Sequence, residues 1–314
     1  MSDQDDPDVI EQAPRYVRMP RIPAGKRPAM LAAVVAAAVV IAAAGTFSAL
    51  RLTSGGSADP DLAGLITEVT TVPVGAAADP ESLETGGALP VAAPSTGPAG
   101  SASILLIDPD TPTAVSGPPL NEAGRPEVLY VATEYCPYCA AENWALIVAL
   151  SRFGRFTGLT TSRSPRFEDV PPIDSWTFYG SSYTSPYLAF VPVETRSNVL
   201  VSPTADKGNG ASYRVLQRLT PAEQAVFDKY DNEGSTPFID FANRAAQTGS
   251  GILPNLVAGR TWQQLAAALR QPKTPLGATL LNEADTLTAE LCRLTGGRPV
   301  AACPHSPRPA KPNR

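Results

Sequence analysis

The stretch EVLYVATEYCPYCAAENWALIVALSRFG, residues 127–154, carries the strongest structural signals in this sequence. Its first seven residues are apolar and β-branched, which predicts a buried strand. Residues 140–154 predict a helix that is apolar on most faces and stops at Gly154. Cys136 and Cys139 lie between the two elements. The order of strand, cysteine pair and helix predicts an α/β domain with a CxxC motif at a helix N-terminus.

The CPYC motif could exchange disulfides, hold a metal or staple a turn. Unpaired N–H groups at a helix N-terminus stabilise a thiolate and lower the pKa of a cysteine placed there. We therefore expect Cys136 to be the attacking thiol and Cys139, one turn further on, to be the resolving thiol. Pro137 presets the turn and removes one competing donor.

A metal site is the sharper alternative, because CxxC is half of a four-cysteine zinc site. The other half would be Cys292 and Cys303, whose spacing is wider than that of a usual zinc knuckle. His305 is the only histidine, so a Cys-His or Ser-His-Asp catalytic arrangement is not expected. We predict no metal and no cofactor.

Residues 28–50 form an uncharged apolar segment that is long enough to cross a membrane. Five basic residues lie just before it, and after Arg51 the next Lys or Arg is Arg125. The positive-inside rule then predicts a cytoplasmic tail at 1–27 and an extracytoplasmic remainder. A cleaved signal peptide is the alternative. All four cysteines would lie outside, where disulfides persist. The net charge of −5 argues against nucleic-acid binding.

Residues 51–124 are rich in Ala, Gly, Pro and Ser, which predicts a linker. The apolar islands LAGLITEV (62–69) and SILLID (103–108) are candidates to dock on the following domain. That domain is expected at 125–305, followed by a disordered tail at 306–314. Further strands are expected at 175–180, 187–194 and 236–243, and helices at 220–231, 261–271 and 277–297. Thr220 and Glu223 have the spacing of a capping box.

A strand–CxxC–helix unit, followed much later by Thr236-Pro237 leading into a strand, resembles the thioredoxin fold. That resemblance implies a cis peptide bond at Pro237 and a Thr236-Pro237 loop that faces the CPYC motif. Pro137, Tyr138, Thr236 and Pro237 would then contact the partner chain. The CPYC pattern is typical of glutaredoxins.

A closer resemblance covers about residues 125–303. The segments EYCPYCAAENWALIVALSRFG, YTSPYLAFVPVE, TPFIDFANR and LCRLTGGRPVAAC together resemble the family called domain of unknown function 929. Its members are membrane-anchored, thioredoxin-like proteins of archaea and actinobacteria. The resemblance implies a thioredoxin-like fold, whereas the activity of the family is not established.

The sequence also departs from thioredoxin. Tyr130 stands where a buried acid normally lies, six residues before the first cysteine. Glu134 and Glu142 are the nearest acids, and we expect both to be solvated. The long gap between Cys139 and Pro237 leaves room for an inserted subdomain at about 163–232. Its aromatic segment, residues 176–187, is expected to serve the core rather than the substrate.

Cys292 ends a predicted helix, and the Gly296-Gly297 turn could return the chain so that Cys303 meets it. We predict a structural disulfide between them. A second redox pair that relays electrons to Cys136 and Cys139 is the alternative.

These observations predict a membrane-anchored, extracytoplasmic thiol–disulfide oxidoreductase. Its partners would be client proteins with cysteines, together with a membrane redox partner that recharges the site. Two alternatives stay open. One is a non-enzymatic binding or envelope-organising protein with an inert CPYC disulfide, since fold does not fix function. The other is metal delivery through the CxxC motif. The direction of electron flow is not determined by the sequence.

Overall fold

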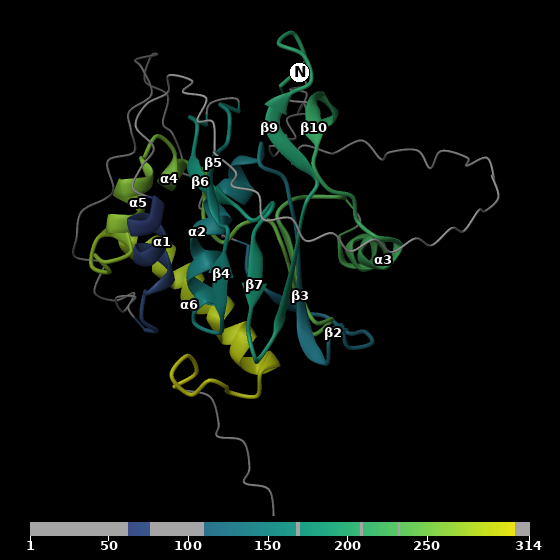
Figure 1. Ribbon diagram of the computed structural model, residues 1–314, viewed down its shortest axis with the longest axis vertical. Coiled ribbons are helices and arrows are strands. Elements are labelled where there is room, and N and C mark those ends of the chain that lie inside the picture. Colours follow the sequence, from purple (N-terminus) through teal and green to yellow (C-terminus); the bar gives the residue numbers. More distant parts are fainter. Residues whose placement is uncertain (1–61, 76–109, 168–169, 208–209, 232, 305–314) are drawn as a thin grey trace, which may run out of the picture. The chain divides into compact units, whose positions relative to one another are not determined.

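The computed structural model describes residues 62–75 and 110–304, apart from 168–169, 208–209 and 232. These residues form a mixed α/β structure around one main sheet, with strand order β1-β12-β11-β3-β2 and with β8 also paired to β3 (Figure 1). The β8 strand runs parallel to β3, whereas the other pairs are antiparallel. The strands are β1 (Thr113–Ala114), β2 (Asn121–Glu122), β3 (Arg125–Ala132), β8 (Ala189–Glu194), β11 (Phe238–Phe241) and β12 (Ala245–Thr248).

Helices cover both faces of this sheet. Side chains alternate along β3, so Val128, Tyr130 and Ala132 belong to one core cluster and Leu129 and Val131 to the other. The first cluster includes the long helices α2 (Pro137–Ser151) and α6 (Pro275–Leu294), and the second includes Phe227 of α3 (Pro221–Tyr230). The shorter helices of the first layer are α1 (Leu62–Thr70), α4 (Pro254–Val257) and α5 (Trp262–Ala268).

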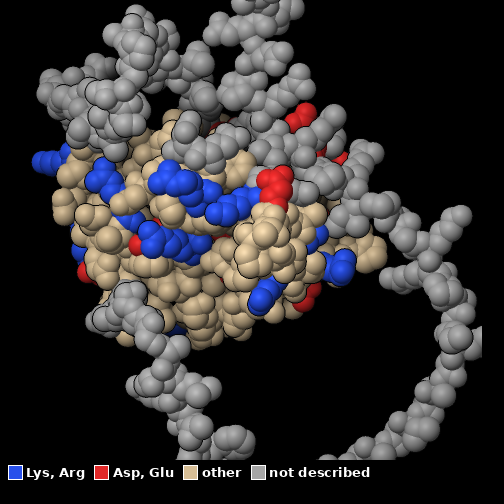
Figure 2. Space-filling model, turned by 90° about the horizontal axis from the view of Figure 1, so that it is seen from above, with Lys and Arg blue, Asp and Glu red and all other residues tan. Residues whose placement is uncertain are grey.

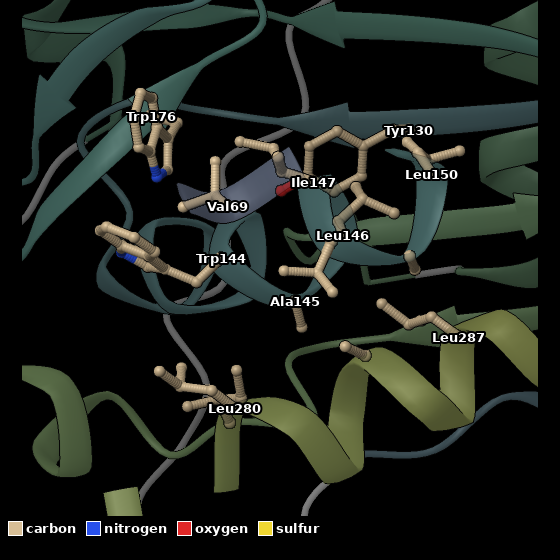
Figure 3. Close-up of a cluster of buried hydrophobic side chains, with 14 of the residues drawn as sticks. Val69, Tyr130, Trp144, Ala145, Leu146, Ile147, Leu150, Trp176, Leu280 and Leu287 are labelled. Atoms are coloured by element: carbon tan, nitrogen blue, oxygen red, sulfur yellow. The ribbon is translucent and has the colours of Figure 1, made fainter. Parts of the chain in front are cut away.

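Helix α2 is buried along almost its whole length, which explains its apolar sequence. Trp144 and Ile147 are fully buried, and Trp144 makes an edge-to-face contact with Trp176 at 5.4 Å between ring centroids. Figure 3 shows these side chains between α2, α6 and the neighbouring strands. A helix that is enclosed on every side fixes the position of its own N-terminus, where the CPYC motif lies.

Three two-stranded ribbons lie outside the main sheet. They pair β4 (Arg155–Thr157) with β7 (Ser182–Thr184), β5 (Thr160–Arg163) with β6 (Asp174–Thr177), and β9 (Arg196–Leu200) with β10 (Tyr213–Val215). A short 3-10 helix, η2 (Gly210–Ser212), leads into β10. The insertion expected at 163–232 needs correction, because β8 lies inside that range and is a central strand beside β3.

The expected domain boundary at 125 is also too late. Both β1 and β2 precede it and pair with β12 and β3, respectively. Helix α1, in the range expected to be linker, docks on the domain through the buried side chains Leu65 and Val69, and Val72 just after the helix is buried with them. Docking of this apolar island on the domain was predicted, whereas its helical structure was not.

The predicted membrane span (28–50) and the island at 103–108 lie outside the described residues. Within 62–75 and 110–304, as described above, no helix has both the length and the apolar character needed to cross a membrane.

Several local predictions are confirmed. The Thr220 hydroxyl accepts a hydrogen bond from the Glu223 N–H, and the Glu223 carboxylate accepts one from the Thr220 N–H, which completes the capping box of α3.

The strand β12 was not predicted from the sequence. It joins β11 through the three residues 242–244, and Ala242 and Asn243 there have φ angles of 54° and 56°. Sequence rules expect glycine in such a turn, so this hairpin gave no signal.

Candidate functional site

Cys136 is the N-cap residue of α2. Its backbone is extended (φ −76°, ψ 124°), and its Sγ accepts a hydrogen bond from the Cys139 N–H at 3.4 Å. Pro137 occupies the start of the helix, where a missing N–H costs nothing. The cap places the sulfur of Cys136 against the unpaired N–H groups of the first helical turn, as the sequence predicted.

The Thr236-Pro237 peptide bond is cis and lies beside the CPYC motif. The Cys136 thiol donates to the carbonyl oxygen of Thr236 at 3.4 Å, across 100 residues of sequence. The sheet explains this proximity, because β11 begins directly after Pro237 and Phe238 pairs with Val131 at the end of β3. The two segments therefore emerge side by side at one edge of the sheet.

The two thiols differ in acidity. Burial opposes ionisation of Cys136, but the hydrogen bonds that Cys139 donates from its thiol and its N–H offset this cost, and the pKa of Cys136 is lowered from the usual 9.0. Burial, followed by the hydrogen bond and charge of Cys136, raises the pKa of Cys139 well above that value. The exposed fraction is 8% for Cys136 and 1% for Cys139. Both are free thiols in this structure, and Cys136 is the better nucleophile of the two.

The four residues predicted to contact a partner differ in exposure. Tyr138 and Thr236 are partly exposed, whereas Pro137 and Pro237 are buried. The structure thus brings all four next to Cys136, and it leaves Tyr138 and Thr236 reachable from outside.

The β9–β10 ribbon packs on the loop before Cys136, which the sequence did not predict. The Glu134 N–H donates to the Arg196 carbonyl at 2.9 Å, and the Asn198 N–H donates to the Glu134 carboxylate at 3.2 Å. The Tyr135 ring stacks on Tyr213, with centroids 4.3 Å apart and planes at 5°. Glu134 is therefore a partly buried anchor of the ribbon rather than a solvated loop residue. No local sequence signal links these distant segments.

Glu142 is the largest correction at the site, because it is fully buried instead of solvated. Its carboxyl accepts hydrogen bonds from the Gln247 amide (3.2 Å), the Ser250 hydroxyl (2.8 Å) and the Gly251 N–H (3.0 Å). Burial and the neighbouring Glu283 raise the pKa of Glu142 well above its usual value. The pair connects α2, α6 and the segment after β12.

A second buried carboxyl belongs to Glu194, at the end of β8. It accepts hydrogen bonds from the Thr177 hydroxyl and from the N–H groups of Phe178 and Tyr179. Burial raises its pKa to about 7, although these hydrogen bonds oppose the shift. Glu194 pairs with Ala132 across the parallel strands, so it lies at the same edge of the sheet as the CPYC motif.

Tyr130 occupies the position of the acid found in thioredoxin, and it is fully buried. Its hydroxyl donates to Asn143 Oδ1 at 2.6 Å, and the Asn143 amide donates to the Trp176 carbonyl at 2.8 Å. Burial and the nearby Cys139 raise the pKa of Tyr130 well above 10, so the phenol stays neutral.

Cys292 and Cys303 form a disulfide, with Cα atoms 5.7 Å apart. This pair lies far from the CPYC motif. Arg152, which follows the last residue of α2, bonds Asp285 and Thr288 of α6, and Cys292 is one turn beyond Thr288. Cys136 is at the opposite end of α2, which is about 22 Å long. The structure therefore does not bring the two cysteine pairs together.

Figure 2 views the end of the domain that carries the β9–β10 ribbon in Figure 1, and Lys and Arg side chains cover more of the described surface there than Asp and Glu do. Among the residues that the structure describes, no group of three His, Cys, Asp or Glu side chains could hold a metal ion.

The fold and the site define a class of protein: a mixed α/β domain with a CxxC motif at a buried helix N-terminus, opposed by a cis-proline loop. The chain belongs to the family described as domain of unknown function (DUF929), whose model matches residues 111–293. The match begins two residues before β1, in agreement with the earlier domain boundary. No curated protein and no solved structure matches the chain.

Proposed function

We propose that this protein is a membrane-anchored, extracytoplasmic thiol–disulfide oxidoreductase with a thioredoxin-like fold. Cys136 would attack a disulfide of a client protein, and Cys139 would resolve the mixed disulfide. The observation that carries the proposal is geometric. Cys136 caps helix α2, accepts the Cys139 N–H and donates to the Thr236 carbonyl of the cis-proline loop, while Cys139 lies buried one turn further on.

The topology supports the thioredoxin-like assignment. The β3 strand enters the CPYC motif, β8 runs parallel to it, and the β11–β12 hairpin follows the cis-proline loop. Helices α2 and α6 lie on one face and α3 on the other. The client strand would lie against Thr236 and Pro237, with Tyr138 beside it.

The membrane anchor is proposed from the sequence of residues 28–50 and their basic flank. The Cys292–Cys303 disulfide fits an oxidising compartment. A membrane redox partner would restore the CPYC pair after each cycle.

The non-enzymatic binding protein is the second candidate, and the near-complete burial of both CPYC thiols favours it. An inert pair would not react with small disulfides in the folded state, whereas the proposed enzyme would.

Trapping tests the proposal. The Cys139→Ala variant, mixed with a disulfide-bonded client protein, is expected to accumulate a covalent complex through Cys136, because the resolving thiol is missing. The complex is measured by non-reducing electrophoresis and mass. The Cys136→Ser variant is the matched control and should form none. Recovery of no complex from Cys139→Ala, while Cys136 still reacts with glutathione disulfide, would exclude client exchange.

A further inference from the structure

The polar groups around Cys139 are already engaged in hydrogen bonds. Tyr130, whose pKa the nearby Cys139 raises, commits its hydroxyl proton to Asn143. Asn143 lies one turn after Cys139 on α2 and donates in turn to the Trp176 carbonyl. A neutral phenol whose proton is engaged in this way cannot accept the proton of a neighbouring thiol.

The two buried carboxyls that act on Tyr130 accept hydrogen bonds from other groups. Glu142 follows Cys139 by three residues, but its oxygens are held by Gln247, Ser250 and Gly251 at the other end of the side chain. The oxygens of Glu194 are held by Thr177, Phe178 and Tyr179. Each carboxyl accordingly serves as a tie between elements.

Other titratable or charged groups also face this part of the core. Cys136 acts on Cys139 directly. Tyr130 and Tyr135 interact with Cys139 as well, and the other groups that act on these two tyrosines are Cys136, Glu142, Glu194 and Arg196. Burial keeps both tyrosines neutral, because it raises the pKa of each. In the mixed disulfide the Cys136 sulfur carries no charge, so burial is what opposes ionisation of Cys139 at that stage.

We propose that Cys139 has no proton acceptor among these groups, so that resolution by Cys139 is the slow step and the mixed disulfide at Cys136 is the long-lived state. The inference rests on the thiol exchange proposed above. For resolution, the Cys139 thiol must lose its proton to hydroxide, attack the Cys136 sulfur and release the client thiolate, which takes up a proton. The Cys136–Cys139 disulfide forms as the client sulfur is reduced.

A long-lived mixed disulfide favours release of the client by a different reaction. The Cys136 thiolate attacks a client disulfide, forms a bond to one client sulfur and releases the other as a thiolate. A further client thiolate then attacks the bound client sulfur, forms a new client disulfide and releases the Cys136 thiolate. The client's disulfides are rearranged with no net electron transfer. The substrate class is therefore a protein with three or more cysteines whose disulfides need isomerisation.

An aromatic disulfide that releases a coloured thiolate separates the two steps. The reduced protein should release one equivalent when Cys136 attacks and a second when Cys139 resolves the mixed disulfide. We expect the second phase to be at least about tenfold slower than the first at pH 7. Its rate should rise about tenfold per pH unit up to about pH 9, because only the thiolate reacts.

Two matched variants test whether a carboxyl acts as the base. In Glu142→Gln and Glu194→Gln, the rate of the second phase should rise with pH as steeply as it does in the wild type. A wild-type plateau near pH 7, or a slowing of more than about threefold in either variant at pH 7, would overturn the inference while leaving the first phase intact. A missing first phase would instead remove the proposed function, and the inference with it.

Isomerisation of client disulfides is measured in a separate experiment. Reduced protein is mixed with a client whose disulfides have been scrambled, and both partners are followed by mass. Cys136 and Cys139 should remain thiols while native client disulfides appear. Stoichiometric formation of a Cys136–Cys139 disulfide during recovery of the client would overturn the isomerase assignment.

Discussion

At the scale of single residues, the CPYC motif consists of two unlike thiols made from identical side chains. Cys136 receives the N–H of Cys139 and faces the Thr236 loop, whereas Cys139 points into the core. Hydrogen bonds to a Cys136 thiolate offset the cost of burying its charge, whereas those to a Cys139 thiolate do not. Position within a single helical turn therefore makes the two thiols unlike.

The difference in acidity predicts a difference in alkylation. The rate at which iodoacetamide modifies Cys136 should reach half its maximum below pH 9, because the pKa of Cys136 is lowered. Cys139 should need a higher pH, since its pKa is raised. Mass spectrometry of peptides, after reaction across pH 5 to 10, measures both. The Cys136→Ser variant should retain only the slow modification, and equal pH profiles for the two cysteines would contradict the assignment.

The sequence predicted that both cysteines lie in the first turn of a helix, but it did not predict the burial of the acids. The CPYC spacing places both thiols in one turn of helix, so local geometry was sufficient. The sequence around Glu142 does not indicate that it is buried, because its partners Gln247, Ser250 and Glu283 come from segments more than 100 residues away. Burial of a charged residue depends on such partners rather than on its own neighbours in the chain.

At the scale of elements, helix α2 is tied to α6 near both ends. Glu142 and Glu283 share the Gln247 amide at the first end, with distances of 3.2 and 3.3 Å from its nitrogen. Arg152 bonds Asp285 at 2.6 Å at the second end. Since the CPYC motif begins α2, these ties fix the orientation of the candidate site.

The buried acid pair makes stability depend on pH. Burial and mutual repulsion raise the pKa of Glu142, and burial raises that of Glu283, above the unfolded value of about 4.5. Groups with a raised pKa contribute fully below pH 4.5, and their contribution is lost as pH rises through the folded pKa. Glu142→Gln should therefore gain stability relative to the wild type between pH 5 and pH 9.

The gain is measured as the difference in midpoint temperature between variant and wild type at several pH values. About 1 kcal/mol corresponds to roughly 2–4 °C for a domain of this size. Glu122→Gln is the matched control, because it makes the same substitution at a carboxylate that is exposed on β2. A difference that shrinks as pH rises would contradict the raised pKa of the pair.

At the scale of the whole molecule, helix α1 extends the core beyond the family match. Val69 is fully buried in the main cluster, and the carbonyl of Pro73 accepts a hydrogen bond from Arg152 at 2.9 Å. The segment between the proposed membrane anchor and the domain therefore includes a docked helix rather than a uniform linker.

Charge placed in this contact should release α1. Val69→Asp buries an unpaired carboxylate, which is strongly unfavourable, so the helix is expected to undock and the midpoint temperature to fall. Proteolysis between 62 and 75 should then accelerate. Thr67→Asp is the matched control, because Thr67 is exposed on the same helix. Equal protease resistance of the two variants would show that α1 does not dock.

Loss of the second cysteine pair should affect stability and not chemistry. Replacing both Cys292 and Cys303 with Ser removes a cross-link between residues 11 apart, which costs about 3 kcal/mol in the chain-entropy model. Denaturant unfolding measures this loss. Because the bridge lies at the far end of α2, the alkylation rate of Cys136 should stay within about twofold of wild type. A large change in that rate would instead support electron relay between the two cysteine pairs, which their separation disfavours.

The sequence by itself determined the features that depend on local spacing. These are the strand and helix around CPYC, the capping box at Thr220, the length of α6 and the pairing of Cys292 with Cys303. Only the tertiary structure decided which distant segments meet. It placed the β9–β10 ribbon on Tyr135, made β8 a central strand, and enclosed Glu142 and Tyr130 in the core. Such contacts arise from the packing of surfaces, and the energy of each depends on residues far apart in the chain.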